Sequence, residues 1–176
     1  MTRDELEHAI RAACDITEDD EVYVFGSQAI LGQFPNPPAA LLMSAEADVS
    51  PKTRIDAVER LNSIGEGSDF HRSFGFYVHG LPITEAAKLP ANWSQRTIPV
   101  RNRNTGGKTG LCVEVHDLAA SKLAAFREKD RDFVRVLVAE RLLKPRTLIA
   151  RIRRLPPPVD VERLVRWVDA TVRDLR

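Results

Sequence analysis

Two carboxylates placed two residues apart are the first feature of this sequence that could do chemistry. Glu46 and Asp48 alternate with small and apolar residues in the stretch 45–49. Side chains at such positions of a strand project from one face, about 7 Å apart. Mg²⁺ prefers carboxylate oxygens and keeps positions open for substrate phosphates. The pair therefore predicts a Mg²⁺ site on a strand, and the alternative is an exposed acidic edge that binds nothing.

A glycine and a serine follow an apolar stretch upstream of the carboxylates. Gly26 and Ser27 separate a strand expected at 22–25 from a small apolar helix expected around 29–31. Free amides at the start of a helix attract anions, the serine hydroxyl adds a donor, and glycine lets a phosphate approach the backbone closely. The pair therefore predicts a phosphate site, although an ordinary Ser27 N-cap would use the same amides.

A lysine lies on the packing face of a helix expected at 117–126. Lys122 is four residues from both Leu118 and Phe126, a spacing that places all three on one side of the helix. Because burial of an unpaired charge is costly, the ammonium must reach a partner or a pocket, unless it extends into solvent. Asp130 is expected as the N-cap of the following helix.

The sequence contains one further acid and four histidines that are candidate ligands. Glu114 alternates with Val113 and Val115 in a strand expected at 111–115, so it is a candidate third metal-site acid or an exposed strand glutamate. The histidines show no metal-ligand spacing and are expected to be structural, with His71 the one to check for substrate contact. They are His8, His71, His79 and His116.

The elements that must position these residues follow an α+β pattern, with strands in the middle of the chain and helices in its last third. Strands are expected at 22–25, 41–49, 74–78, 98–101 and 111–115. Helices are expected at 4–14, 53–64, 117–126, 131–143, 146–154 and 159–175. We expect a single domain over 1–176, with an α+β core at 1–115 and a helical part at 116–176.

The charge of the chain is unevenly distributed. Its 176 residues, 43% of them hydrophobic, suit one core, and the net charge is +1. Residues 127–176 carry fourteen basic and eight acidic side chains, a net of +6, whereas residues 1–126 carry twelve and seventeen, a net of −5. The near-zero total therefore does not exclude a nucleic-acid partner. The basic stretch 144–154 contains no acid and is either an RNA-binding surface or a solvated helix face.

Two features predict a cytoplasmic protein with no membrane segment. Cys14 and Cys112 are single and far apart, which matches neither a disulfide framework nor a metal cluster. The charged start of the chain does not fit a signal peptide, and no window approaches the roughly 18 apolar residues of a membrane span.

The order of these motifs resembles the DNA polymerase β-type nucleotidyltransferase superfamily, with Gly26-Ser27 before the strand that carries Glu46 and Asp48. The phrases FGSQAIL, GEGSDFH, NTGGKTGLCVEVHDLAASKLAA and FREKDRDFV resemble bacterial toxin-like nucleotidyltransferases of the AbiE and MenAT type, over residues 22–143. Two positions depart from the family pattern. Glu46 stands where many members have aspartate, and Ser27-Gln28 stands where some toxins have Gly-Thr.

The resemblance implies a small polymerase β-like sheet with flanking helices and a C-terminal helical bundle. It implies a toxin that transfers a nucleotide from an NTP, with Mg²⁺, to the 3′ end of tRNA, and a cognate antitoxin as partner. Glu46 and Asp48 would bind the metal, and Gly26, Ser27, Lys122 and Asp130 would bind the nucleotide, with Lys122 also offsetting charge during transfer. The alternatives are a protein or small-molecule acceptor, or a non-catalytic relative that binds a partner.

Overall fold

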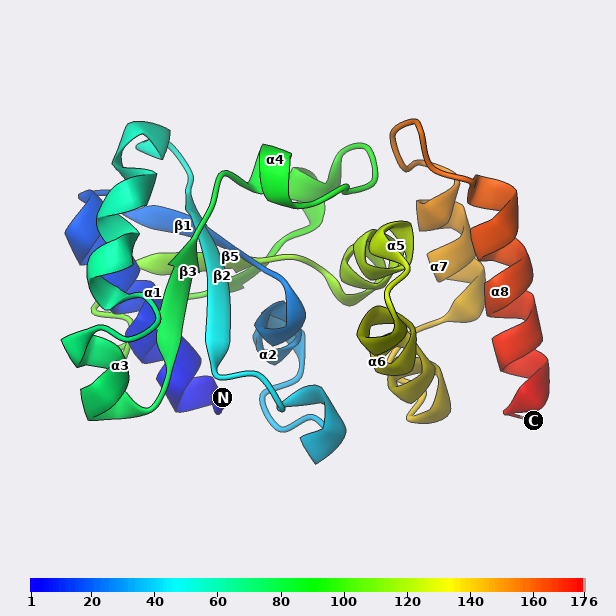
Figure 1. Ribbon diagram of the computed structural model, residues 1–176, viewed down its shortest axis with the longest axis horizontal. Helices are drawn as coiled ribbons and strands as arrows, with labels where there is room; N and C mark the ends of the chain where they lie inside the picture. The colour runs from blue at the N-terminus through cyan, green and yellow to red at the C-terminus, as the bar shows by residue number, and fades with distance from the viewer. Residues whose placement is uncertain (176) are drawn as a thin grey trace.

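The computed structural model describes residues 1–175 and contains a five-stranded mixed sheet beside a group of C-terminal helices (Figure 1). The strands are β1 (Glu21–Phe25), β2 (Glu46–Pro51), β3 (Tyr77–Gly80), β4 (Ile98–Val100) and β5 (Thr109–Cys112). Their order is β3-β2-β1-β5-β4, in which β1 pairs antiparallel with β2 and parallel with β5. The pair β2 and β3 is parallel, and the pair β4 and β5 is antiparallel. The expected α+β class is confirmed.

Helices flank the sheet and form most of the C-terminal third. The α-helices are α1 (Arg3–Thr17), α2 (Ile30–Gln33), α3 (Asp69–Phe74), α4 (Ile83–Ala86), α5 (Val115–Ala125), α6 (Glu128–Ala139), α7 (Pro145–Ile152) and α8 (Val161–Asp174). The 3₁₀ helices are η1 (Ser27–Ala29), η2 (Ala39–Leu41), η3 (Ile55–Ile64) and η4 (Trp93–Arg96). Within residues 1–175, no helix is both long and apolar enough to cross a membrane.

Helix α1 buries one face of the sheet. Thr2 begins it with a capping box, in which its side chain accepts from the Glu5 amide while the Glu5 carboxylate accepts from the Thr2 amide. Leu6 and Ile10 are fully buried, and α1 contacts β1, β2, β3 and β5. A methyl group on Gly110 of β5 would lie 2.3 Å from Ile10, so this glycine is needed for the close approach of helix and sheet.

The alternation of side chains along β2 determines which of them face away from the core and are available for binding or catalysis. Ala47 and Val49 are fully buried, whereas Glu46 and Asp48 point to the opposite face and are only partly buried. Period-two alternation therefore separates the core face from the acidic face, as the sequence predicted.

Several expected boundaries are wrong. β2 begins at Glu46 because residues 39–41 form a 3₁₀ turn, so the strand expected from Leu41 is too long. The helix expected at 53–64 is the 3₁₀ helix η3, since the apolar spacing identifies a buried face without fixing the hydrogen-bond pattern. Phe74 ends α3, which Ser68 caps, and does not begin a strand.

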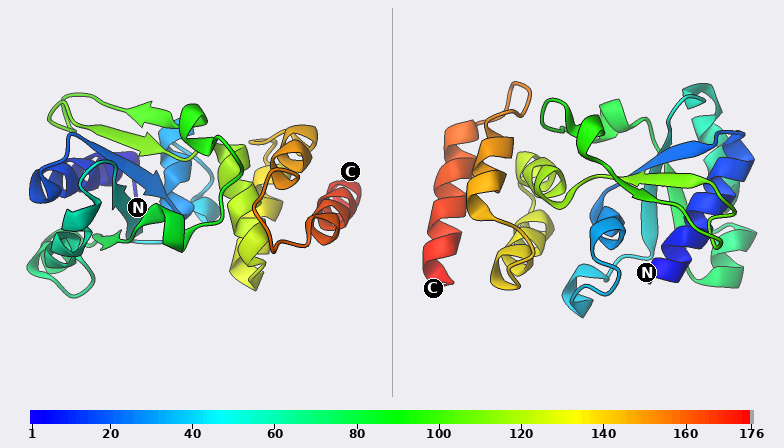
Figure 2. Two further views of the ribbon diagram at one scale, coloured as in Figure 1. Left: turned by 90° about the horizontal axis from the view of Figure 1, so that it is seen from above. Right: turned by 180° about the vertical axis from the view of Figure 1, so that it is seen from behind.

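The four C-terminal helices lie where the sequence predicted them, within a few residues. Helices α5 and α6 lie between the sheet and the outer pair α7 and α8, as all views show (Figures 1 and 2). Phe126 adopts a left-handed conformation, with φ of 55°, and ends α5 as its C-cap.

A buried carboxylate joins the C-terminal helices to the segment between the two edge strands, β3 and β4. Asp117 is fully buried and accepts two hydrogen bonds from Arg96, at 2.7 and 2.9 Å. Arg151 of α7 lies 3.1 Å from the same carboxylate. Because Arg96 is in η4, Asp117 in α5 and Arg151 in α7, the cluster links these three elements.

We expect Asp117→Ala to lower the free energy of unfolding by about 3 kcal/mol, because two partly buried guanidinium groups lose their counter-charge. Urea denaturation followed by circular dichroism measures this loss. Asp169→Ala, at an exposed position of α8, is the control and should change stability by less than about 0.5 kcal/mol. Equal effects of the two substitutions would show that the cluster does not hold α5 in place.

Candidate functional site

Strand pairing brings four polar side chains to one face of the sheet. In the parallel pair of β2 and β3, Glu46 lies beside Tyr77 and Asp48 lies beside His79. In the antiparallel pair of β1 and β2, Phe25 lies opposite Asp48, which brings Gly26 next to that carboxylate. The acids are therefore positioned by the central strands, and their partners by the neighbouring edge strand.

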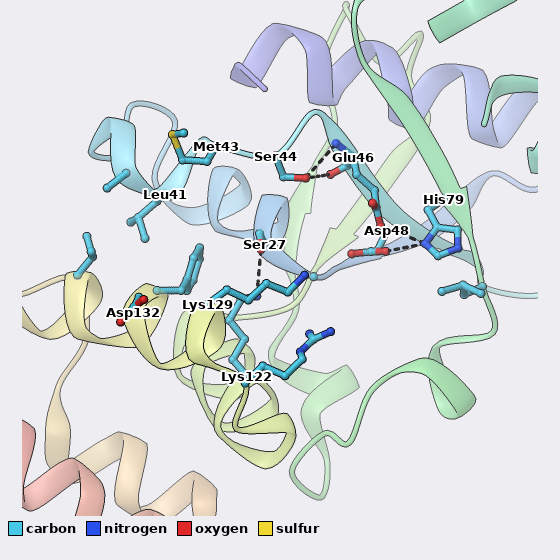
Figure 3. A pocket seen from close by; sticks show the side chains of 16 residues that line it. Ser27, Leu41, Met43, Ser44, Glu46, Asp48, His79, Lys122, Lys129 and Asp132 are labelled. Carbon is cyan, nitrogen blue, oxygen red and sulfur yellow. Dashed lines mark hydrogen bonds and ion pairs between the residues drawn. The ribbon is translucent and has the colours of Figure 1, made fainter. Parts of the chain in front are cut away.

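Glu46, Asp48 and His79 form a cluster with the dimensions of a metal site (Figure 3). Nδ1 of His79 is 3.0 Å from Oε1 of Glu46 and 3.2 Å from Oδ1 of Asp48. One ligand atom from each of the three lies within 4.8 Å of the others, and the hydroxyl of Tyr77 donates to Oε2 of Glu46 at 3.0 Å. Two carboxylates that share one face fit the oxygen preference of Mg²⁺, so these side chains could hold that ion.

The two carboxylates differ in their pKa. Burial and the neighbouring Glu46 raise the pKa of Asp48 to about 7, while His79 acts in the opposite direction. Burial also acts to raise the pKa of Glu46, but hydrogen bonds from Asp48, Tyr77 and His79 outweigh it and leave that pKa lowered. The repulsion between the carboxylates is what a bound cation would relieve.

Gly26 is required by the position of Asp48. A methyl group on Gly26 would lie 1.9 Å from Oδ2 of Asp48, which is far inside van der Waals contact. The residue also has φ of 69° and ψ of −165°, a conformation that is essentially restricted to glycine. The carboxylate can therefore lie against the turn only because this position has no side chain.

Ser27 and Lys122 meet across the boundary between the sheet and the helices. Nζ of Lys122 donates to Oγ of Ser27 at 3.0 Å, lies 3.6 Å from Oδ1 of Asp130 and stands 4.6 Å from the centre of the Phe133 ring. The lysine side chain is 11% exposed, so it does not extend into solvent. Burial lowers the pKa of Lys122, and Asp130 and Asp48 oppose this shift.

The local structure around this lysine differs from the sequence prediction in two ways. Arg127, and not Asp130, occupies the N-cap of α6, and its side chain donates to the buried Asp130 at 2.6 Å. The helix that begins at Ser27 is a single 3₁₀ turn of three residues, so its dipole is small. The serine hydroxyl and the ammonium of Lys122 are therefore the main candidate contacts for a phosphate.

One cavity of about 660 Å³ contains both the carboxylates and the serine–lysine pair. Its other charged residues include Arg127 and Lys129, and its apolar wall includes Leu41 and Met43 (Figure 3). The volume is within the usual range for small-molecule sites. Acids from the sheet and cations from the helices thus line a space large enough for a nucleotide.

Glu114 is not part of this arrangement. Because β5 ends at Cys112, Glu114 is the N-cap of α5 and not a strand residue, so the reasoning that made it a metal ligand is wrong. Its Oε2 accepts from the amide of His116 at 3.0 Å, and its Oε1 lies 2.6 Å from Nδ1 of the same residue.

Sequence reasoning missed His79 and Tyr77. Both lie on the same face of β3. Their spacing in the sequence predicts this shared face, but it does not predict that β3 pairs with β2. His71, the histidine singled out in the sequence, packs its ring against Tyr77 with the ring centres 4.7 Å apart. It therefore supports a partner of Glu46 and does not line the main cavity.

Family models, curated proteins and solved structures were compared with the chain, and none matches.

We expect Gly26→Ala to destabilise the protein more than Gly67→Ala. Both glycines have a positive φ, but a methyl group on Gly67 would meet nothing within 4 Å. A positive φ costs a residue with a side chain about 1–3 kcal/mol, and the conformation of Gly26 lies at the upper end. The collision with Asp48 should add about 1–3 kcal/mol. The free energy of unfolding in urea measures both losses. In an Asp48→Ala background the excess at Gly26 should shrink, and an unchanged excess would contradict the contact.

We expect Asp48→Asn to raise the free energy of unfolding by on the order of 1 kcal/mol at pH 8. The pKa of Asp48 is about 7 in the folded chain, against an ordinary value of 3.8, so its ionised form costs stability above pH 7. This cost disappears as the pH falls towards 4, and the advantage of the variant should disappear with it. Urea denaturation across this pH range measures the difference.

Metal addition provides the matching test of the same carboxylate. Mg²⁺ should raise the melting temperature of the wild type and leave that of Asp48→Asn unchanged, because ligand binding to the folded state stabilises it. Glu85→Gln, an exposed substitution outside the cavity, is the control and should respond as the wild type does. An equal response of all three proteins would contradict metal binding at Asp48.

Proposed function

We propose that this protein is a metal-dependent nucleotidyltransferase of the polymerase β type, which transfers a nucleotide from an NTP to an acceptor hydroxyl. One observation carries the proposal: paired carboxylates and a serine–lysine pair line the same cavity of about 660 Å³. Two acids suit a divalent cation, and a hydroxyl beside an ammonium suits a phosphate. Their combination matches what the transfer of a charged phosphoryl group needs.

In this proposal Glu46 and Asp48 hold Mg²⁺, which when bound would neutralise negative charge on the triphosphate. Ser27 and Lys122 bind the β- and γ-phosphates and keep them on the helical side of the carboxylates. Arg127 and Lys129, which line the same cavity, add positive charge where the leaving group develops negative charge. Asp130 holds Lys122 and Arg127 in place through its ion pairs.

The transfer step forms a bond between the acceptor oxygen and the α-phosphorus. The bond from that phosphorus to its bridging oxygen breaks, and pyrophosphate leaves with the electron pair. The proton of the hydroxyl passes to Nε2 of His79, because Nδ1 of that ring faces the carboxylates. The carboxylates thus also orient the histidine that accepts the proton.

We propose two classes of acceptor for the nucleotide. The 3′ end of tRNA, with the chain acting as a toxin that an antitoxin controls, follows from the family resemblance and from exposed basic residues in and around α7. These residues are Lys144, Arg146, Arg153 and Arg154. Arg151 of the same stretch is paired with Asp117 and does not belong to that surface. A protein or a small molecule is the other class.

Transfer of label from each of the four α-³²P-labelled NTPs, with Mg²⁺, to total tRNA, to total protein and to small hydroxylated molecules tests the function. We expect the wild type to label one acceptor class and Asp48→Ala to lose at least about 10³-fold in rate, as loss of a group that binds the charged reactants does. Circular dichroism checks that the variant is folded, and Glu85→Ala is the active control. Retained activity in Asp48→Ala would refute the metal assignment. No transfer to tRNA, protein or small acceptors with any NTP would favour a partner-binding protein without catalysis.

A further inference from the structure

We infer that a second cavity beside the carboxylates receives the acceptor, and that the acceptor is a small hydroxylated amine such as an amino sugar or amino alcohol. This inference rests on the proposed function, since it concerns the second substrate of the same reaction. The charge and position of the side chains that surround the transfer site favour this acceptor class over RNA.

The second cavity opens next to the proposed metal site. It has a volume of about 330 Å³ and shares Glu46 and His79 with the larger cavity. Tyr77 lines it as well, as do Asn62 of η3 and Glu66, which follows η3. The carboxylate and imidazole groups therefore stand between two spaces, of which the larger suits a nucleotide and the smaller suits a compact acceptor.

In-line geometry assigns the smaller cavity to the acceptor. In phosphoryl transfer the attacking and leaving oxygens lie on opposite sides of the phosphorus. The leaving pyrophosphate is on the side of Ser27 and Lys122, which are 3.0 Å apart and line only the larger cavity. The acceptor must therefore approach from the side of His79, which is where the smaller cavity opens.

The two cavities differ in charge. Lys122, Arg127 and Lys129 line the larger one, as a triphosphate requires. Among the residues that the structure describes, no lysine or arginine lines the smaller one, whereas Glu46 and Glu66 do. Because the metal would neutralise Glu46, Glu66 is the carboxylate there that would repel a polyanion such as RNA and attract an ammonium group.

The position of the basic surface agrees with this assignment. Helix α7, with the basic stretch around it, lies at one end of the long axis of the molecule, and α3 and β3 lie towards the other (Figure 1). Neither cavity is lined by a residue of α7. An RNA held by these basic residues would therefore have to extend past α5 to bring its end to the side of His79.

The reaction at this site is a complete group transfer. A hydroxyl oxygen of the amine bonds to the α-phosphorus, pyrophosphate leaves with the electron pair of the broken phosphorus–oxygen bond, and the hydroxyl proton passes to Nε2 of His79. The ammonium group of the acceptor stays protonated and lies near Glu66. No oxidant, reductant or further reactant is required.

Three sugars that differ in charge test the proposal. Glucosamine, glucose and glucose 6-phosphate are offered at equal concentration with each NTP and Mg²⁺, and nucleotidylated sugar is measured by mass spectrometry beside pyrophosphate release. We expect transfer to glucosamine to exceed transfer to glucose by about fivefold, the effect of one partly exposed charge pair, with glucose 6-phosphate lowest. In Glu66→Gln the ratio of glucosamine to glucose should fall towards one. Glu59→Gln, an exposed substitution on η3 that lines neither cavity, should keep the wild-type ratio.

Each result separates this inference from the proposed function. Equal or greater transfer to glucose 6-phosphate, or labelling of tRNA or protein without transfer to glucosamine, would overturn the inference and leave the nucleotidyltransferase intact. Pyrophosphate release that no sugar changes would overturn it in the same way. A wild type that neither binds NTP nor releases pyrophosphate would refute the proposed function itself.

Discussion

The antiparallel register between β1 and β2 is the constraint on which the candidate site depends. It places Phe25 opposite Asp48, so the next residue must turn directly beneath a carboxylate, and only glycine can do so. A slip of one residue would move Glu46 and Asp48 to the face that α1 covers and would expose Ala47 and Val49. The hydrophobic pattern that builds the core therefore also positions the acids, and the core cannot form in another register without burying them.

The cavity belongs to neither half of the protein alone. The sheet supplies Glu46 and Asp48, and the helices that follow supply Lys122, Arg127 and Lys129. Asp117 links the two by pairing with arginines before and after α5, and α5 carries Lys122 to Ser27. Because Asp117 is two turns or less from Lys122 on the same helix, the ion-pair cluster sets where the ammonium lies.

The sequence predicted the parts of the site that depend on local pattern. Alternation placed Glu46 and Asp48 on one face, and helical spacing placed Lys122 on the packing side of its helix. His79 escaped prediction because its role depends on the pairing of β3 with β2, which the order of residues does not encode locally. Glu114 was misassigned because the last residue of a strand and the N-cap of a helix both have an extended backbone. The sequence pattern therefore does not distinguish a strand end from a helix N-cap at this position.

The carboxylate pair is unfavourable for the fold taken by itself. Two acids on one face repel each other, and burial of Asp48 adds to the cost, as its raised pKa of about 7 shows. Hydrogen bonds offset this cost only in part. The Tyr77 hydroxyl and His79 both bond to Glu46, whereas of these two groups only His79 bonds to Asp48. A structural role would be filled as well by a neutral side chain at position 48. In the proposed function these two carboxylates, beside a glycine that makes room for them, would hold a cation whose charge would offset that of Asp48.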